Sequence, residues 1–99
     1  MNRIHLNKIC SNITSIVSDI DGVLTTGEII YSNSGIEFKS FNVKDGSSIV
    51  RLQNKGIEFA LISGREAVAN QLRAKELGIK HLCENISDKG KALDELIKN

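Results

Sequence analysis

Two aspartates one residue apart carry the clearest chemical signal in the chain. Asp19 and Asp21 follow a predicted strand at residues 13–18, and Gly22 permits a sharp turn after the second acid. Side chains two apart in a strand point the same way, so the two carboxylates are expected to converge. Two carboxylates so close repel each other, and a divalent cation, a shared proton or a cationic substrate group relieves this repulsion. The pair predicts phosphoryl transfer, with Asp19 as nucleophile, Asp21 as proton donor and acceptor, and Mg²⁺ between carboxylate and phosphate; the alternative is a pair of solvated turn residues.

A second polar group follows the nearly continuous apolar run at residues 57–62, which is typical of a buried parallel strand. Ser63, Gly64 and Arg65 offer a hydroxyl, an unhindered backbone N–H and the start of a helix, which together can hold phosphate oxygens. The alternative for Ser63 is a simple helix cap.

A third group follows a short predicted strand at residues 79–83. A lysine at the start of the next helix would neutralise the phosphate and the charge near Asp19, although a single lysine is more often a solvated surface residue. Spacing leaves open whether Lys89 or Lys91 points inward. Asp45 is similarly ambiguous: it either caps a helix or reaches into the cleft, and capping is favoured.

The elements that position these groups alternate between strands and helices. Asn-Ser-Gly at residues 33–35 predicts a β-hairpin between two loosely alternating segments, whereas apolar periodicity predicts the helices. We expect strand 13–18, hairpin strands 28–33 and 36–41, helix 46–55, strand 57–62, helix 65–77 (packed through Val68, Ala69, Leu72 and Leu77), strand 79–83 and helix 89–98. This order predicts an α/β fold with right-handed crossovers and a three-layer, Rossmann-like parallel sheet, whose ligands bind beyond the carboxyl ends of the strands.

Composition limits the alternatives. The 99 residues are expected to form one domain, residues 1–99, with 40% hydrophobic and 25% charged residues. A net charge of +1 gives no field that would recruit nucleic acid or an anionic membrane, and no apolar run is long enough to span a bilayer. Cys10 and Cys83 are predicted to be free thiols in a reducing compartment, and the cytoplasm is the expected location.

The motifs together resemble the haloacid dehalogenase-like phosphatase superfamily. Residues 19–25 (Asp-Ile-Asp-Gly-Val-Leu-Thr) match its first motif, Ser63 within residues 62–65 matches the second, and Lys89 within residues 87–89 matches the third. The hairpin at 28–41 and the segment that follows it to residue 46 resemble one branch, the 3-deoxy-D-manno-octulosonate 8-phosphate phosphatases and the similar domains attached to some sialic-acid cytidylyltransferases.

The resemblance implies Mg²⁺-dependent hydrolysis of a phosphorylated sugar acid through an aspartyl-phosphate. Asp19 would be nucleophile and metal ligand, and Asp21 would act as acid/base and give its carbonyl to the metal. Ser63 and Lys89 would hold the phosphoryl group, while Arg65 or Lys44 would meet the anionic part of the substrate. It also implies a tetramer associating through the hairpins, with a neighbouring subunit helping to close the site.

One family motif has no counterpart. The fourth, an acidic loop after a further core strand that supplies another Mg²⁺ ligand, has no match in the 99 residues. The resemblance therefore predicts a shortened phosphatase with weakened Mg²⁺ binding and with its first strand at a sheet edge. Two alternatives stay open: a catalytically silent oligomerisation or interaction module, and a receiver-like domain with a phosphorylatable aspartate. The receiver is disfavoured because a hairpin follows the first strand where a receiver would have a helix.

Overall fold

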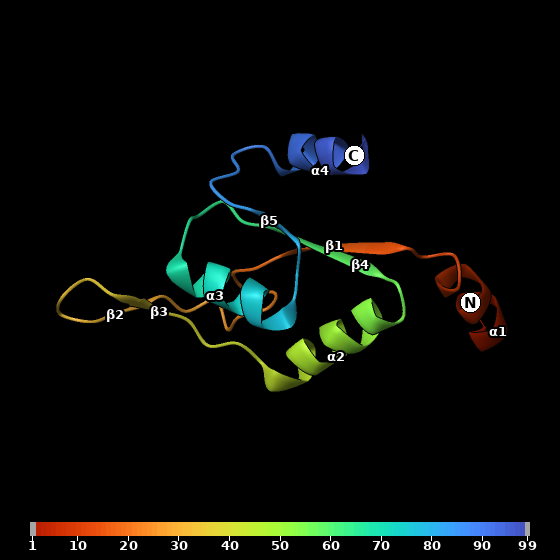
Figure 1. The fold of residues 1–99 in the computed structure, drawn as a ribbon, viewed down its shortest axis with the longest axis horizontal. Coiled ribbons are helices and arrows are strands. Elements are labelled where there is room, and N and C mark those ends of the chain that lie inside the picture. Colours follow the sequence, from red (N-terminus) through yellow and green to blue (C-terminus); the bar gives the residue numbers. More distant parts are fainter. Residues whose placement is uncertain (1, 99) are drawn as a thin grey trace.

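A three-stranded parallel sheet forms the centre of the chain in the computed structural model, which describes residues 2–98 (Figure 1). The strands β1 (Ser15–Asp19), β4 (Glu58–Ile62) and β5 (His81–Cys83) lie in the order β1-β4-β5. Asp19 pairs with Ile62 and Ile62 pairs with Cys83, so the three strands end level with one another. This register places the residues that follow each strand at one edge of the sheet.

Helices cover both faces of this sheet, which confirms the predicted three-layer α/β fold. Helices α2 (Val43–Asn54) and α3 (Val68–Leu77) lie on one side, and α4 (Lys89–Lys98) lies on the other (Figure 1). The core forms between β4 and the α2–α3 layer, and its buried members are Ile20, Ile49, Phe59, Leu61, Ala74, Leu77 and Ile79. β4 is buried from Phe59 to Ile62, as its apolar run predicted.

The hairpin is present but its strands are shorter than predicted. β2 (Ile30–Tyr31) pairs antiparallel with β3 (Glu37–Phe38), around a turn in which Gly35 has a φ of 85°. This left-handed conformation favours glycine. An isolated bridge between Thr25 and Phe41 closes the base of the hairpin where it leaves the sheet. The hairpin projects away from the rest of the chain (Figure 1).

Two helix starts differ from the prediction. α2 begins at Val43 because the side chain of Asn42 accepts hydrogen bonds from the N–H groups of Lys44 and Asp45, so Asp45 lies inside the first turn and is not the cap. α3 begins at Val68 rather than at residue 65, so Ser63 does not cap it. The predicted packing face of α3 is also wrong in part, because Val68 and Leu72 are exposed whereas Asn70 is buried.

Two further features concern the ends of the described chain. Helix α1 (Arg3–Cys10) was not predicted. It has no buried residue, so it contributes no side chain to the core. Cys10 and Cys83 are free thiols, as expected. Within residues 2–98, none of the helices has the length and hydrophobicity needed to cross a membrane.

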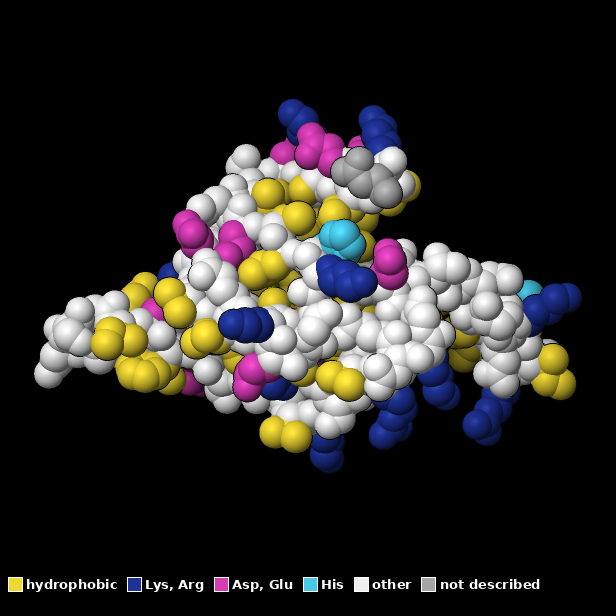
Figure 2. All heavy atoms as spheres, viewed as in Figure 1, with side chains coloured by type: hydrophobic (Ala, Val, Ile, Leu, Met, Phe, Trp, Pro, Cys, Tyr) yellow, Lys and Arg dark blue, Asp and Glu magenta, His cyan; other side chains and the backbone are white. Residues whose placement is uncertain are grey.

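β1 lies at one edge of the sheet, as the resemblance implied. A groove of about 750 Å³ runs between this edge and α4, and its lining includes Val17, Phe59 and Ile97. The space-filling view shows α4 standing apart from the body of the molecule on this side (Figure 2). α4 has no buried residue, so it is the most loosely held of the layers.

Candidate active site

The carboxyl end of β1 holds Asp19 in a defined orientation. One oxygen, Oδ1, accepts a hydrogen bond of 2.8 Å from the N–H of Ile20, and Oδ2 lies 3.1 Å from Nζ of Lys89. Lys89 is the first residue of α4, where Asp88 caps the helix by accepting from the N–H of Lys91. The structure thus answers a question that spacing left open: Lys89, not Lys91, reaches the first aspartate.

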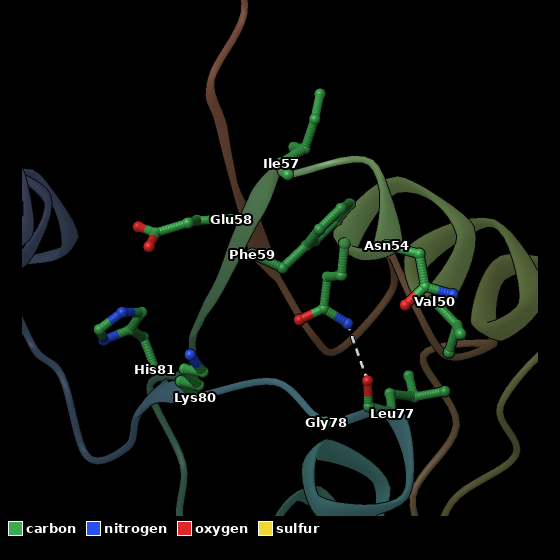
Figure 3. Close-up of a pocket in the computed structure, with 11 residues that line it drawn as sticks. Val50, Asn54, Ile57, Glu58, Phe59, Leu77, Gly78, Lys80 and His81 are labelled. Carbon is green, nitrogen blue, oxygen red and sulfur yellow. Dashed lines mark hydrogen bonds between the residues drawn. The ribbon is translucent and has the colours of Figure 1, made fainter.

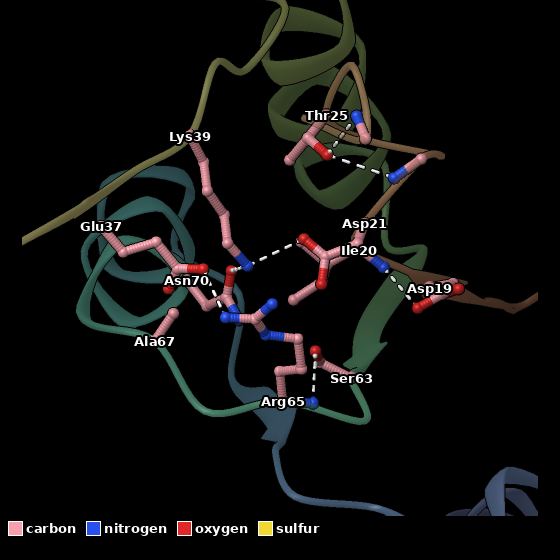
Figure 4. Close-up of polar contacts among 12 residues, drawn as sticks. Asp19, Ile20, Asp21, Thr25, Glu37, Lys39, Ser63, Arg65, Ala67 and Asn70 are labelled. Atoms are coloured by element: carbon pink, nitrogen blue, oxygen red, sulfur yellow. Dashed lines mark hydrogen bonds and ion pairs between the residues drawn. The ribbon is translucent and has the colours of Figure 1, made fainter. Parts of the chain in front are cut away.

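Asp21 has a different cationic partner. Its Oδ1 lies 2.8 Å from Nζ of Lys39, which comes from the segment following β3 (Figure 4). We expected the charges of the two aspartates to be relieved by a metal, a shared proton or a substrate. In the structure each carboxylate is paired with its own lysine, Lys89 for Asp19 and Lys39 for Asp21. The loop after Asp21 is held by Thr25, whose hydroxyl accepts from the N–H groups of Gly22 and Gly27.

Ser63 lies at the level end of the neighbouring strand and is almost completely buried. Its backbone N–H donates to the carbonyl of Cys83 and its carbonyl accepts from the N–H of Ile86, so Ser63 is fixed to the end of β5. The Ser63 hydroxyl accepts a 3.2 Å hydrogen bond from the N–H of Arg65, which organises the turn through Gly64. The Ser63 hydroxyl therefore stabilises this turn and does not cap a helix.

Arg65 and Lys44, the two residues predicted to meet the anionic part of the substrate, differ in their surroundings. The guanidinium of Arg65 lies 2.6 Å from Glu37 of β3 and 3.4 Å from the hydroxyl of Tyr31, so it joins the turn to the hairpin. The Tyr31 hydrogen bond, followed by the charge of Glu37, raises the pKa of Arg65. Lys44 is exposed in the first turn of α2, and within the described chain no ion pair brings it to Asp19 or Asp21.

Three polar residues of this site were not predicted from the sequence. Glu84 accepts a hydrogen bond of 2.8 Å from the N–H of Ala67 and also accepts from Asn70, so it ties the start of α3 to the segment after β5. Asn70 in turn accepts from Lys39. One signal for Lys39 was available in the sequence: it lies two residues after Glu37 in an extended segment, so both side chains are expected on the same face.

The arrangement suits an anion next to a nucleophilic carboxylate. Lys89 at the start of α4, and the Ser63 hydroxyl and the backbone N–H of Gly64 just after β4, can all donate to phosphate oxygens. Asp19 and the carbonyl of Asp21 are hard oxygen ligands, which suit Mg²⁺. Residues 2–98 contain no group of three His, Cys, Asp or Glu side chains placed to hold a metal.

A separate pocket lies at the opposite ends of the strands. It has a volume of about 380 Å³ and is lined by residues such as Val50, Ile57 and Gly78, with Gln53 donating 2.8 Å to the carbonyl of Leu77 (Figure 3). It contains none of the predicted site residues. Since ligands of open α/β sheets bind at the carboxyl ends, we do not assign this pocket to the phosphoryl chemistry.

Comparison with known proteins shows which proteins the chain is similar to. No protein-family profile matches the chain. It is 44% identical over 87 residues to the 3-deoxy-D-manno-octulosonate 8-phosphate phosphatase KdsC of Yersinia pestis, covering 88% of this chain and 46% of that protein. The corresponding phosphatase of Moraxella catarrhalis, solved with magnesium, phosphate and KDO, superimposes with a TM-score of 0.91 at 38% identity, over 98% of this chain and 56% of that one.

A HAD superfamily (subfamily III A) hydrolase of Legionella pneumophila superimposes with a TM-score of 0.87 at 34% identity, over 96% of this chain and 54% of that one. The chain therefore spans about half the length of the curated relatives that it matches.

Proposed function

The chain belongs to the haloacid dehalogenase-like superfamily and is related to its 3-deoxy-D-manno-octulosonate 8-phosphate phosphatases, and from this premise we propose that it hydrolyses a phosphate monoester of a sugar acid. The observation that carries the proposal is the 3.1 Å contact between Asp19 and Lys89, beside the buried Ser63 of the next strand. We expect this nucleophile, cation and hydroxyl to surround one phosphoryl group beyond the carboxyl ends of the strands.

The roles follow from the groups present. A carboxylate oxygen of Asp19 attacks phosphorus, the bond from phosphorus to the ester oxygen breaks, and Asp21 gives its proton to the departing sugar oxygen. Water then attacks the aspartyl-phosphate, Asp21 takes a proton from that water, and the bond between phosphorus and Asp19 breaks to release phosphate. Lys89 and Ser63 hold the equatorial phosphate oxygens, and the N–H of Gly64 adds a donor.

Mg²⁺ fits the donor set: the Asp19 carboxylate and the Asp21 carbonyl would hold it. When bound, it would offset the negative charge of the phosphate. Both ligands come from one strand end, and Mg²⁺ is often bound by one or two carboxylates together with water and substrate phosphate.

Phosphate release tests the proposal. With 3-deoxy-D-manno-octulosonate 8-phosphate as substrate, we expect release in the presence of Mg²⁺ and loss of at least about 90% of it with excess EDTA, because the metal supplies charge that the protein side chains do not replace. Re-addition of Mg²⁺ is the control for denaturation. Equal rates with and without EDTA would contradict the role of the metal, and no release under either condition would contradict the function.

The exposed apolar side chains of the hairpin favour a second role for this chain, which is association with other copies of itself. Five of the hairpin's large apolar side chains are at least 40% exposed, namely Ile29, Ile30, Tyr31, Ile36 and Phe38, and yellow side chains gather on this projection in the space-filling view (Figure 2). An isolated two-stranded hairpin is marginally stable, so burial against other copies would stabilise it. We propose a homo-oligomer, expected to be a tetramer, formed through residues 28–41 in the cytoplasm. If hydrolysis fails, this assembly remains as the function of a silent interaction module.

Charge on the hairpin is expected to break the assembly. Ile30 and Phe38 form a cross-strand pair, and placing a carboxylate in a buried apolar interface is strongly unfavourable. The double variant Ile30→Glu, Phe38→Glu should be monomeric by sedimentation, with an unchanged circular dichroism spectrum. Ile4→Glu is the matched control, because Ile4 is 82% exposed on α1. A wild-type chain that sediments as a monomer would refute assembly through the hairpin.

A further inference from the structure

Lys39 is a buried cation with a defined set of partners. Its side chain is 0% exposed, and Nζ lies 2.8 Å from Oδ1 of Asp21 and 3.1 Å from Oδ1 of Asn70. Lysines are almost never fully buried unless they are paired, because an isolated buried charge is costly. The position of this ammonium is therefore determined by Asp21 and Asn70, and the same two contacts restrict where the carboxylate of Asp21 can lie.

Asn70 is itself held in place. It is 1% exposed, and its Nδ2 donates to Glu84, which also accepts a hydrogen bond from the N–H of Ala67 at the start of α3. The amide oxygen faces the ammonium, which is the required orientation because lysine has donors only. Figure 4 shows hydrogen bonds that run from Asp21 through Lys39 to Asn70. The chain continues from Asn70 to Glu84, in the segment after β5.

The hairpin delivers Lys39 by strand alternation. Glu37 and Lys39 are two residues apart, so their side chains lie on one face of an extended segment. Glu37 meets Arg65 at 2.6 Å while Lys39 meets Asp21 at 2.8 Å. These two ion pairs fix the base of the hairpin to the turn after β4 and to the loop after β1. The hairpin therefore contributes to the geometry of the site as well as offering an apolar surface.

We propose that Lys39 is a positioning residue for Asp21, an inference that rests on the proposed function. Its ammonium pairs with Oδ1 of Asp21, so Oδ2 is the oxygen that carries the proton moving to and from the substrate. Asp21 remains 30% exposed on its side chain, so it can reach a bound ester while Lys39 stays inaccessible to it. Lys39 acts through Asp21 and has no contact with the reacting atoms.

The orientation of Asp21 can be measured without any turnover. Crystal structures of the wild-type chain and of Lys39→Met and Lys39→Arg are compared, with Lys80→Met as a control at an exposed lysine. We expect Asp21 to leave its wild-type rotamer in Lys39→Met and to keep it in Lys39→Arg and Lys80→Met. If Lys39→Met fails to fold, ¹⁵N NMR of the wild-type ammonium groups replaces it: slow proton exchange at Lys39 that is lost in Asp21→Asn supports the proposal. An unchanged Asp21 rotamer in Lys39→Met, or a Lys39 ammonium that exchanges as fast as Lys80, overturns it.

Kinetics provide the second test. Lys39→Met is expected to lower kcat about 100-fold while KM changes less than about threefold, because positioned proton transfer contributes on the order of 10² to 10⁴. Lys39→Arg should recover part of kcat. In an Asp21→Asn background the same change should have little further effect, since the two residues act as a unit. Additive losses would overturn the proposal. A wild-type chain that releases no phosphate contradicts the proposed function instead, and the rotamer of Asp21 still decides the role of Lys39.

Discussion

Replacing Asp19 by asparagine is expected to reduce phosphate release by on the order of 10⁴-fold or more, the size of loss seen when an enzyme loses its covalent nucleophile. The amide is neutral and cannot form the aspartyl-phosphate. The substitution keeps the size of the side chain, so an amide oxygen can still accept the 2.8 Å hydrogen bond from the N–H of Ile20. Initial rates of phosphate release at saturating substrate and Mg²⁺ are the measurement.

The control for this variant is Asp94→Asn, an exposed acid in α4 on the same side of the sheet as Lys89. It changes the net charge equally and should leave the rate unchanged. The Asp19→Asn chain should also remain folded, because the Asp19–Lys89 pair is partly exposed on both sides and such pairs contribute less than about 1 kcal/mol. Release that survives in Asp19→Asn would remove Asp19 from the mechanism.

The order of elements was predictable because each one leaves a local mark in the sequence. The run ending at Ile62 predicted a buried strand, and residues 33–35 marked the hairpin turn. The placement of the acid pair and of Ser63 at level strand ends follows from parallel topology alone. Those predictions needed only periodicity and turn chemistry.

The helix starts and the partners of the aspartates were less predictable because they depend on contacts between distant residues. Ser63 seemed a possible cap, yet the backbone just before α3 is held by Glu84, which lies 17 residues further along the chain than Ala67 and accepts from its N–H. Lys39 has no local signal beyond strand alternation, since its partners are 18 and 31 residues away. Asn70 occupies a buried place on α3 that periodicity assigned to apolar neighbours, because Lys39 and Glu84 both bond to it.

Leu61→Ala is expected to have the largest effect on stability. Leu61 is 2% exposed in the centre of β4, in contact with the α2–α3 layer, and leucine-to-alanine changes at such sites cost about 2–5 kcal/mol through lost burial and the cavity left behind. Because domains of this size are stable by about 5–15 kcal/mol, the loss is a large fraction of the total. We expect the thermal midpoint to fall by about 8–40 °C, at about 4–8 °C per kcal/mol. Urea unfolding followed by circular dichroism gives the free energy directly.

Leu72→Ala is the matched control, because Leu72 is 60% exposed on α3 and the same chemical change should cost less than about 1 kcal/mol there. Equal losses for the two variants would contradict the placement of Leu61 in the core. If residues 1–99 unfold as one cooperative domain, as we propose, the slope of the urea transition should be unchanged in Leu61→Ala. Leu61 is not one of the groups proposed to contact the phosphate, so phosphate release in this variant should fall with the folded fraction on heating and match wild type well below the midpoint.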